Sequence, residues 1–187
     1  DAVLSTVGMN ASEIWTATQY VDDVGTINLL EAAEDNGVSS FVMESSLGVG
    51  GDRGSLMAET FRIALNPVIE AKTRAEAAIR DSELRYTIFR PGSLVGGWAS
   101  GPVQVADAGS GFWGITSRQD VARFMVASLY TPEAADRTFE IVRNPLFAGR
   151  SVDLDWNVSG DPIRRPSPSR FAFPIRAVRR FRDRTRT

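Results

Sequence analysis

Short runs of apolar residues alternate along the chain with longer segments in which apolar positions recur every three or four residues. The short runs are rich in β-branched and aromatic residues and predict four buried strands, at positions 2–7, 40–43, 86–90 and 138–142. The longer segments predict three amphipathic helices, over 20–36, 68–81 and 121–129. Strands that alternate with helices form parallel βαβ units, so the pattern predicts an α/β fold, a doubly wound parallel sheet with helices on both faces.

The ends of the predicted helices carry signals of their own. Gly37 follows the first helix, where a glycine can close the last turn, and Pro67 stands at the entry of the second. Ser117 precedes the third helix, and Asp120 follows three residues later, a spacing close to a capping box. We expect Asp120 to act in that cap.

The composition excludes several kinds of chemistry. The chain contains no His and no Cys, which removes disulfides, thiolate zinc sites, cysteine nucleophiles and imidazole acid–base catalysis. We expect no metal site. Chemistry would have to come from carboxylates, hydroxyls, arginines, backbone amides or the single lysine, Lys72.

The formal net charge of −2 conceals an uneven distribution. Residues 162–187 hold nine arginines and one aspartate, whereas the rest of the chain is acidic. We therefore predict a domain over 1–150 and a basic, flexible tail over 151–187. The tail is either solvated or a basic helix that contacts an anionic surface or the acidic domain. An acidic domain with one lysine suits a halophilic protein, although a GC-rich genome also favours arginine.

The chain has no run of about 18 to 20 apolar residues that could span a membrane, and its start does not resemble a signal peptide. We expect a cytoplasmic protein that acts on a small molecule, and nucleic acid is an unlikely partner of the acidic domain. The first residue is Asp1, and an apolar run follows at once. This start predicts a piece of a longer chain or a processed product.

Ligands of open parallel sheets bind beyond the carboxyl ends of the strands, and here those ends carry Gly8, residues 44–46 and residues 90–93. Six motifs follow one another in order: a strand ending at Gly8, Val21-Asp22-x-x-Gly25-x-x-Asn28-Leu29, Phe41-Val42-x-x-Ser45-Ser46, Ala71-Lys72-x-x-Ala75-Glu76, Thr87-Ile88-x-Arg90-Pro91-Gly92 and Ser117-Arg118-x-Asp120-Val121-Ala122. Over residues 1–143 this order resembles the atypical short-chain dehydrogenase/reductases, and within them the NAD(P)H-binding group that includes flavin and biliverdin reductases.

The resemblance implies a Rossmann-like fold, NADP or NAD as cofactor, and hydride transfer to a flavin-, quinone- or carbonyl-like acceptor. It also implies a role for individual residues. Thr6, Val7 and Gly8 would line the adenosine half of the cofactor, and Ser45 and Ser46 would lie near the nicotinamide. Lys72 would hold the nicotinamide ribose, and Ser45 and Lys72 are the candidate catalytic residues. The loop that would pass the carboxamide comprises Pro91, Gly92, Ser93 and Leu94.

Two features depart from the family. A tyrosine serves as general acid four residues before the family's lysine, and that position is Val68, which cannot donate a proton. The family's Gly-rich phosphate-binding turn would precede Asp1, so we expect the chain as it stands to bind NAD(P) weakly or not at all. The loop over 48–54 offers a G-x-G start as an alternative phosphate site, or else it covers a substrate cleft.

Simpler interpretations remain open at this stage. Lys72 could be a solvated helix residue that pairs with Glu76, and the serines after the second strand could bond locally. Arg90 could form an ion pair beneath the cofactor loop. The whole protein could be a non-catalytic NAD(P)-binding sensor or scaffold, or a cofactor-free remnant that acts through its tail.

Overall fold

The computed structural model describes residues 1–10, 12–51, 55–96, 102–143, 151–152 and 154–156. The described helices are α1 (Val24–Asp35), α2 (Leu56–Ala64), α3 (Asn66–Asp81) and α4 (Arg118–Ser128), with 3₁₀ turns η1 (Val49–Gly51) and η2 (Pro132–Ala134). The strands are β1 (Ala2–Ser5), β2 (Ser40–Glu44), β3 (Arg85–Pro91), β4 (Ser93–Val95), β5 (Val103–Asp107), β6 (Ile115–Ser117) and β7 (Arg137–Arg143). Each predicted helix and strand is present, with its ends shifted by up to four residues.

The strands form one seven-stranded sheet in the order β1-β2-β3-β7-β6-β4, and β5 pairs with β7. The first four strands of this order are parallel, which confirms the predicted doubly wound architecture. β5 runs antiparallel to β7, and the contact between β6 and β7 is antiparallel too, so the sheet is mixed at that end. Because β1, β2 and β3 are parallel neighbours, their carboxyl ends meet at one edge of the sheet.

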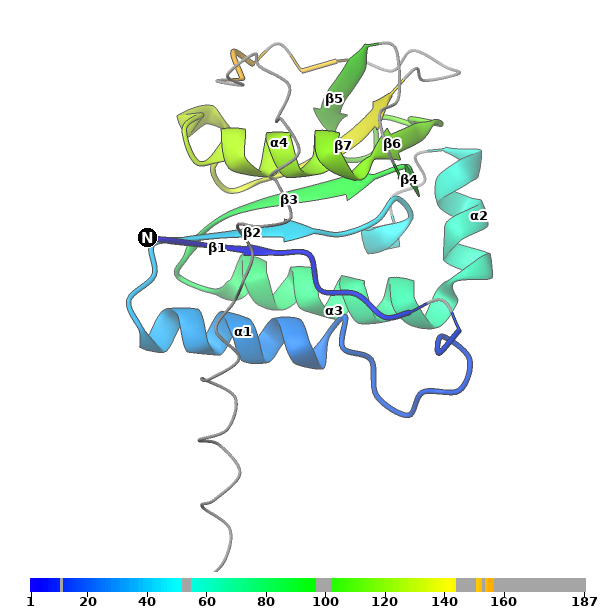
Figure 1. Ribbon diagram of the computed structural model, residues 1–187, viewed down its shortest axis with the longest axis horizontal. Coiled ribbons are helices and arrows are strands. Elements are labelled where there is room, and N and C mark those ends of the chain that lie inside the picture. Colours follow the sequence, from blue (N-terminus) through cyan, green and yellow to red (C-terminus); the bar gives the residue numbers. More distant parts are fainter. Residues whose placement is uncertain (11, 52–54, 97–101, 144–150, 153, 157–187) are drawn as a thin grey trace, which may run out of the picture.

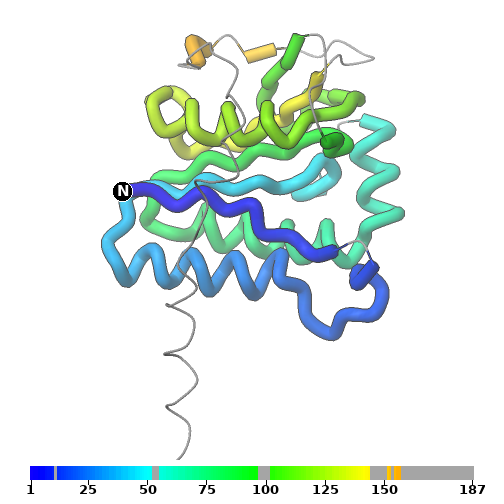
Figure 2. Tube along the Cα trace, in the orientation of Figure 1, coloured from blue at the N-terminus to red at the C-terminus, as the bar shows by residue number. Residues whose placement is uncertain are grey.

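Helices cover both faces of the sheet, as predicted (Figures 1 and 2). The α1 and α3 pair lies on one face and α4 on the other. Alternate side chains of β2 serve the two layers, since Met43 packs in the cluster with α1 and α3 while Val42 packs in the cluster with α4. A strand buried on both faces explains why the sequence shows β2 as a continuous apolar run.

Short polar side chains cap the starts of α1, α2 and α4, and in α2 the cap is Ser55, which accepts a hydrogen bond from the backbone N–H of Ala58 at 3.1 Å. Asp23 caps α1 through the backbone N–H of Val24, so α1 begins four residues later than the apolar pattern predicts. Ser117 caps α4 by accepting a hydrogen bond from the backbone N–H of Asp120, as predicted. The Asp120 carboxylate also takes part, because it accepts a hydrogen bond from the Ser117 hydroxyl at 2.6 Å.

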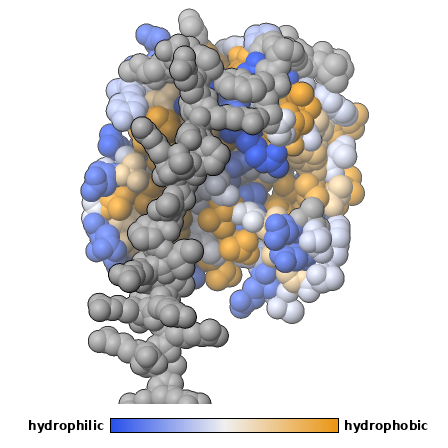
Figure 3. Space-filling model, in the orientation of Figure 1, coloured by the Kyte–Doolittle hydropathy of each residue, from blue (hydrophilic) through white to orange (hydrophobic). Residues whose placement is uncertain are grey.

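Part of the segment that was predicted to be a tail packs against the domain. The backbone N–H of Val152 donates to the carbonyl oxygen of Val105 at 2.8 Å, and the Trp156 ring lies 5.2 Å from the ring of Phe139. Residues 157–187, with the arginine-rich stretch, lie outside the described residues. Among the described helices, none is both long and apolar enough to cross a membrane, and the face in Figure 3 intersperses polar and apolar residues.

Candidate functional site

The carboxyl edge of β1, β2 and β3 brings several of the predicted site residues together. Thr6, Val7 and Gly8 follow the end of β1, and Ser45 and Ser46 follow the end of β2. Pro91 ends β3, Gly92 follows it, and Ser93 and Leu94 begin β4. Parallel neighbours place these chain segments side by side although they are far apart in the sequence. We call this region the carboxyl edge.

Lys72 reaches the carboxyl edge from α3. Its side chain is buried, and its Nζ lies 3.1 Å from Oδ1 of Asp22 and 3.4 Å from the carbonyl oxygens of both Val7 and Glu44. The Asp22 contact is an ion pair that is close in distance but not aligned as a hydrogen bond. The interpretation of Lys72 as a solvated partner of Glu76 is therefore wrong, because α3 turns Lys72 beneath the ends of β1 and β2.

Asp22 is a residue whose part in this site sequence reasoning missed. Its side chain is fully buried, and its Oδ2 accepts a hydrogen bond from the backbone N–H of Met9 at 3.0 Å. Asp22 thereby links the segment after β1 to the amine of Lys72. The only signal for it in the sequence is its place in the Val21-Asp22-x-x-Gly25 motif, which gives no hint of its partners.

Gly8 leaves open space beside the amine. A Cβ atom at this position would lie 3.5 Å from Oδ1 of Asp22 and 4.0 Å from Nζ of Lys72, which are ordinary contacts. No packing against the described residues therefore requires glycine here. Gly8 is therefore the backbone position that lies against both Asp22 and the amine of Lys72.

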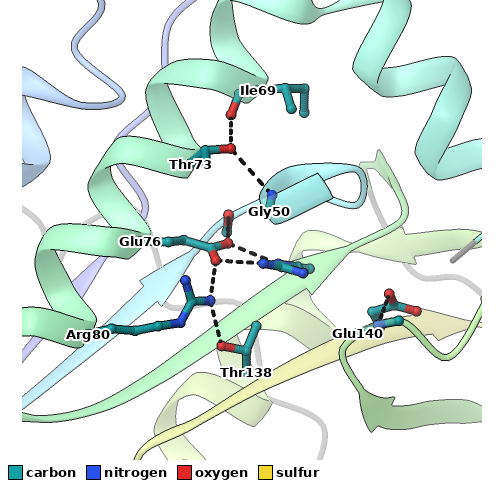
Figure 4. A network of polar contacts seen from close by, with 10 residues as sticks. Gly50, Ile69, Thr73, Glu76, Arg80, Thr138 and Glu140 are labelled. Atoms are coloured by element: carbon teal, nitrogen blue, oxygen red, sulfur yellow. Dashed lines mark hydrogen bonds and ion pairs between the residues drawn. The ribbon is translucent and has the colours of Figure 1, made fainter. Parts of the chain in front are cut away.

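Ser45 points the other way, since its hydroxyl binds Glu76. Figure 4 shows the buried ionic network in which Glu76, Arg80 and Thr138 lie. The Ser45 hydroxyl donates to Oε1 of Glu76 at 2.5 Å, and Arg90 donates to both carboxylate oxygens at 3.0 and 2.8 Å. Arg80 binds the same carboxylate and also donates to Oγ1 of Thr138 at 3.0 Å. Arg90 thus forms the ion pair that was considered for it. We call this set of side chains the Glu76 network.

Ser46 bonds locally. Its half-buried hydroxyl donates to the carbonyl oxygen of Leu47 at 3.1 Å. This is the local strand-end interaction that was left open for the serines after β2. Of the two hydroxyls that follow β2, that of Ser45 donates to Glu76 and that of Ser46 donates to the neighbouring backbone.

Two glycines of the loop after β2, Gly48 and Gly50, have packing reasons for their presence. Gly50 has a φ of 83°, and a Cβ there would lie 2.5 Å from Nη2 of Arg90. Gly48 has a φ of 90°, and a Cβ there would lie 2.5 Å from the carbonyl oxygen of Ala58 in α2. Residues 52–54, the remainder of the alternative phosphate site, lie outside the described residues.

Gly92 also has an internal reason to be glycine. Its backbone N–H donates to the carbonyl oxygen of Ile141 and to Oγ1 of Thr116, both at 3.1 Å. A Cβ at this position would collide with the carbonyl oxygen of Gly114. The chain can therefore pass from β3 to β4 only where position 92 carries no side chain.

Glu44, the last residue of β2, was expected at the carboxyl ends of the strands, but sequence reasoning gave it no role in the site. Its side chain is half-buried at the carboxyl edge. Burial raises the pKa of its carboxyl group above the usual value, and the positive charges of Lys72 and Arg118 only partly offset that rise. A carboxyl group with a raised pKa at a predicted ligand site is a candidate for proton transfer.

A cavity of about 140 Å³ lies at the opposite edge of the sheet. It is lined by the residues that begin β2 and β3, Ser40 and Arg85, and by Ser128 to Pro132 after α4. It contains none of the predicted site residues. The charged groups described above thus belong to a separate region of the molecule.

Comparison with known proteins identifies relatives of this arrangement. The family described as NAD(P)H-binding matches residues 1–132. An uncharacterized sugar epimerase, YhfK, of Bacillus subtilis is 34% identical over 142 residues, which cover 75% of this chain and 62% of the relative.

Two solved structures share the fold with higher coverage. A candidate NAD-dependent epimerase/dehydratase from Bacillus halodurans has a TM-score of 0.61 at 28% identity, over 77% of this chain and 64% of that protein. The anaerobillin reductase ChuY of Escherichia coli O157:H7 has a TM-score of 0.63 at 25% identity, over 79% of this chain and 66% of that protein.

The chain spans about two thirds or less of the length of these relatives. The match nevertheless extends from the first residue through α4 and includes Lys72, Asp22 and the ends of β1, β2 and β3. The chain belongs to the NAD(P)H-binding family.

Proposed function

We propose that the protein is an NAD(P)H-dependent oxidoreductase of the atypical short-chain dehydrogenase/reductase type, which transfers hydride to a small flavin-, quinone- or carbonyl-like acceptor. The observation that carries this proposal is the buried amine of Lys72 at the carboxyl edge. A lone lysine in a chain whose other cationic residues are arginines has a role that arginine would not fill equally well.

The contacts of Lys72 suit an exchange of partners. Its distances to the carbonyl oxygens of Val7 and Glu44, both 3.4 Å, are long for N–H···O hydrogen bonds. Ribose hydroxyls that approach past Gly8 would offer the ammonium shorter contacts. Asp22 would hold the amine in place while it exchanges these partners.

The cofactor supplies the hydride, and the chain supplies binding and orientation. Lys72 would hold the ribose and keep a positive charge near the nicotinamide, where it favours a developing negative charge on the acceptor. Thr6, Val7 and Gly8 would line the adenosine half. Ser45 and Ser46 would border the nicotinamide, and the segment from Pro91 through Gly92 and Ser93 to Leu94 would border its carboxamide.

Among the relatives, ChuY is named a reductase, and that name supports reduction as the reaction class. The absence of the family tyrosine fits an acceptor that does not need this particular acid. Val68 lies in α3 one turn before Lys72 and is half-buried. The alternative is an NAD(P)-binding sensor or scaffold. In it Lys72 would bind the cofactor in the same way, but no hydride would be transferred.

The proposal is tested with the natural full-length protein and two variants of α3. Lys72→Met removes the amine, and Arg74→Met is the matched control because it removes one positive charge from an exposed position two residues away. We expect Lys72→Met to raise the Kd for NADPH or NADH by about tenfold or more, equivalent to about 1.4 kcal/mol, with little change in the control.

An unchanged Kd in Lys72→Met would refute the role of the lysine. Turnover is followed by cofactor absorbance with flavin, quinone and carbonyl acceptors. Tight binding without oxidation of NADPH or NADH by any of these acceptors would overturn the oxidoreductase and favour the sensor.

A further inference from the structure

The proposed reaction needs a proton as well as a hydride when the acceptor is a carbonyl or a quinone. The family's donor position holds Val68, and the chain has no His or Cys. Ser45 and Ser46 already direct their hydroxyl hydrogens to Glu76 and to the backbone of Leu47. The carboxyl edge therefore needs a different proton donor.

Glu44 lies where such a donor is needed. Its carbonyl oxygen is 3.4 Å from Nζ of Lys72, so its backbone adjoins the amine that would hold the ribose. Side chains alternate along β2, and Glu44 shares the α4 face with Val42, whereas Ser45 turns to Glu76 on the α3 face. The carboxyl group thus emerges on the opposite side of the sheet from the Glu76 network.

The carboxyl group of Glu44 has charged neighbours but no hydrogen-bond partner among the described residues. No hydrogen bond to it is seen within the described residues, although it is half-buried. The charged groups near it are Lys72 from α3 and Arg118 at the start of α4, with Asp22 behind the lysine. The neighbouring strand β3 contributes only the apolar Phe89 at the paired position.

We propose that Glu44 is the proton donor of the reaction, an inference that rests on the proposed function. The acceptor gains two electrons and one hydrogen as the hydride that NAD(P)H supplies, and its oxygen takes the proton from the O–H bond of the Glu44 carboxyl group. The carboxylate that remains recovers a proton from water. The raised pKa of Glu44 supports this role, because burial keeps the acid form populated to a higher pH than in an exposed glutamate.

The first test reads the carboxyl group directly, without cofactor. Carbon-13 NMR of labelled glutamate side chains follows each titration in the wild type and in Glu44→Gln, with the exposed Glu70→Gln as control. We expect Glu44→Gln to remove a resonance that titrates above the ordinary glutamate range, and Glu70→Gln to leave that resonance in place. If Glu44 titrates in the ordinary range, the donor assignment is overturned.

The same variant has a signature in stability. A carboxyl group whose pKa is raised by folding lowers the free energy of unfolding as pH rises from its unfolded pKa through its folded pKa. Glu44→Gln should therefore gain stability relative to the wild type at neutral pH and lose that gain in acid. A difference that does not depend on pH would contradict the assignment.

The second test uses the full-length protein with a carbonyl or quinone acceptor. We expect Glu44→Gln to keep the Kd for NADPH within about twofold, because the amide preserves the shape of the side chain, and to lower kcat by about 100-fold or more. If the wild type turns over and Glu44→Gln has the same kcat at every pH, only the proton-donor role of Glu44 is overturned. Failure of the wild type to oxidise bound cofactor with any acceptor would overturn the proposed function and the donor role with it.

Discussion

Lys72 and Glu76 stand one turn apart on α3, and both are buried, yet their surroundings differ in kind. Glu76 is bound by Ser45, Arg80 and Arg90, and the contacts of Ser45 and Arg90 are 3.0 Å or shorter. Lys72 has one contact of 3.1 Å that is poorly aligned and two of 3.4 Å. The helix α3 therefore carries two buried charges of different kinds. The hydrogen-bonding capacity of Glu76 is filled, which we call saturated, whereas that of Lys72 is not.

This difference separates a structural role from a binding role. A buried charge whose hydrogen-bonding capacity is filled has nothing left to offer a ligand, so the Glu76 network joins α3 to β3 and β7. A buried charge with long contacts gains when a better partner arrives, and this is the condition for binding. Buried charges are common in proteins. The number and length of their hydrogen bonds distinguish a structural charge from one that binds a ligand.

The largest effect is expected from Glu76→Gln. This change removes the Glu76 carboxylate that binds Arg90, a residue only 3% exposed, and breaking one side of a buried ion pair costs about 3–5 kcal/mol. Urea unfolding measures the loss, with Glu70→Gln on the exposed face of the same helix as the control. If the two variants differ by less than about 0.5 kcal/mol, the Glu76 network is not what holds α3 to the sheet.

Two glycines extend the comparison to the backbone beside each charge. Gly50→Ala places a side chain 2.5 Å from Arg90 at a φ of 83°, and we expect a loss of about 1–3 kcal/mol in the free energy of unfolding. Gly8→Ala places a methyl group in ordinary contact with Asp22 and Lys72 and should change stability by less than about 0.5 kcal/mol. Thermal unfolding of both variants gives the contrast, and equal losses would refute it.

The sequence allowed much of the fold to be predicted because β2, β3 and β7 are rich in β-branched and aromatic residues and α1 and α3 follow helical periodicity. Three strands, β4, β5 and β6, were missed because pairing with neighbours, not local pattern, holds them in place; β4 and β6 have only three residues each. The helix α2 was missed as well, although Ser55 caps it and its apolar residues recur at helical spacing. The sequence therefore held a signal for α2 that was not used.

Local pattern alone is not enough for the site either. Lys72 could be found because it is the single lysine in a recognisable motif. Asp22 and Glu44 could not be assigned, since their importance lies in what folding brings to them: Met9 and Lys72 for the first, burial beside two cations for the second. For the same reason Ser45 matched the motif, yet its hydroxyl bonds Glu76.

The smallest expected effect concerns acid, where Asp120 should behave in the opposite sense to Glu44. Burial tends to raise the pKa of Asp120, but hydrogen bonds from Arg143, at 2.8 Å to Oδ2, and from Ser117 outweigh it and hold the pKa below the usual value. A depressed pKa contributes stability that is present above the unfolded value and lost as pH falls through the folded value.

Asp120→Asn should therefore be less stable than the wild type at neutral pH, and the difference should shrink in acid, below about pH 4. Urea unfolding across this range, with Asp81→Asn at the end of α3 as control, measures it. A loss in Asp120→Asn that persists undiminished in acid would show that Asp120 acts through its shape and not its charge, and would remove it from the saturated class that Glu76 defines.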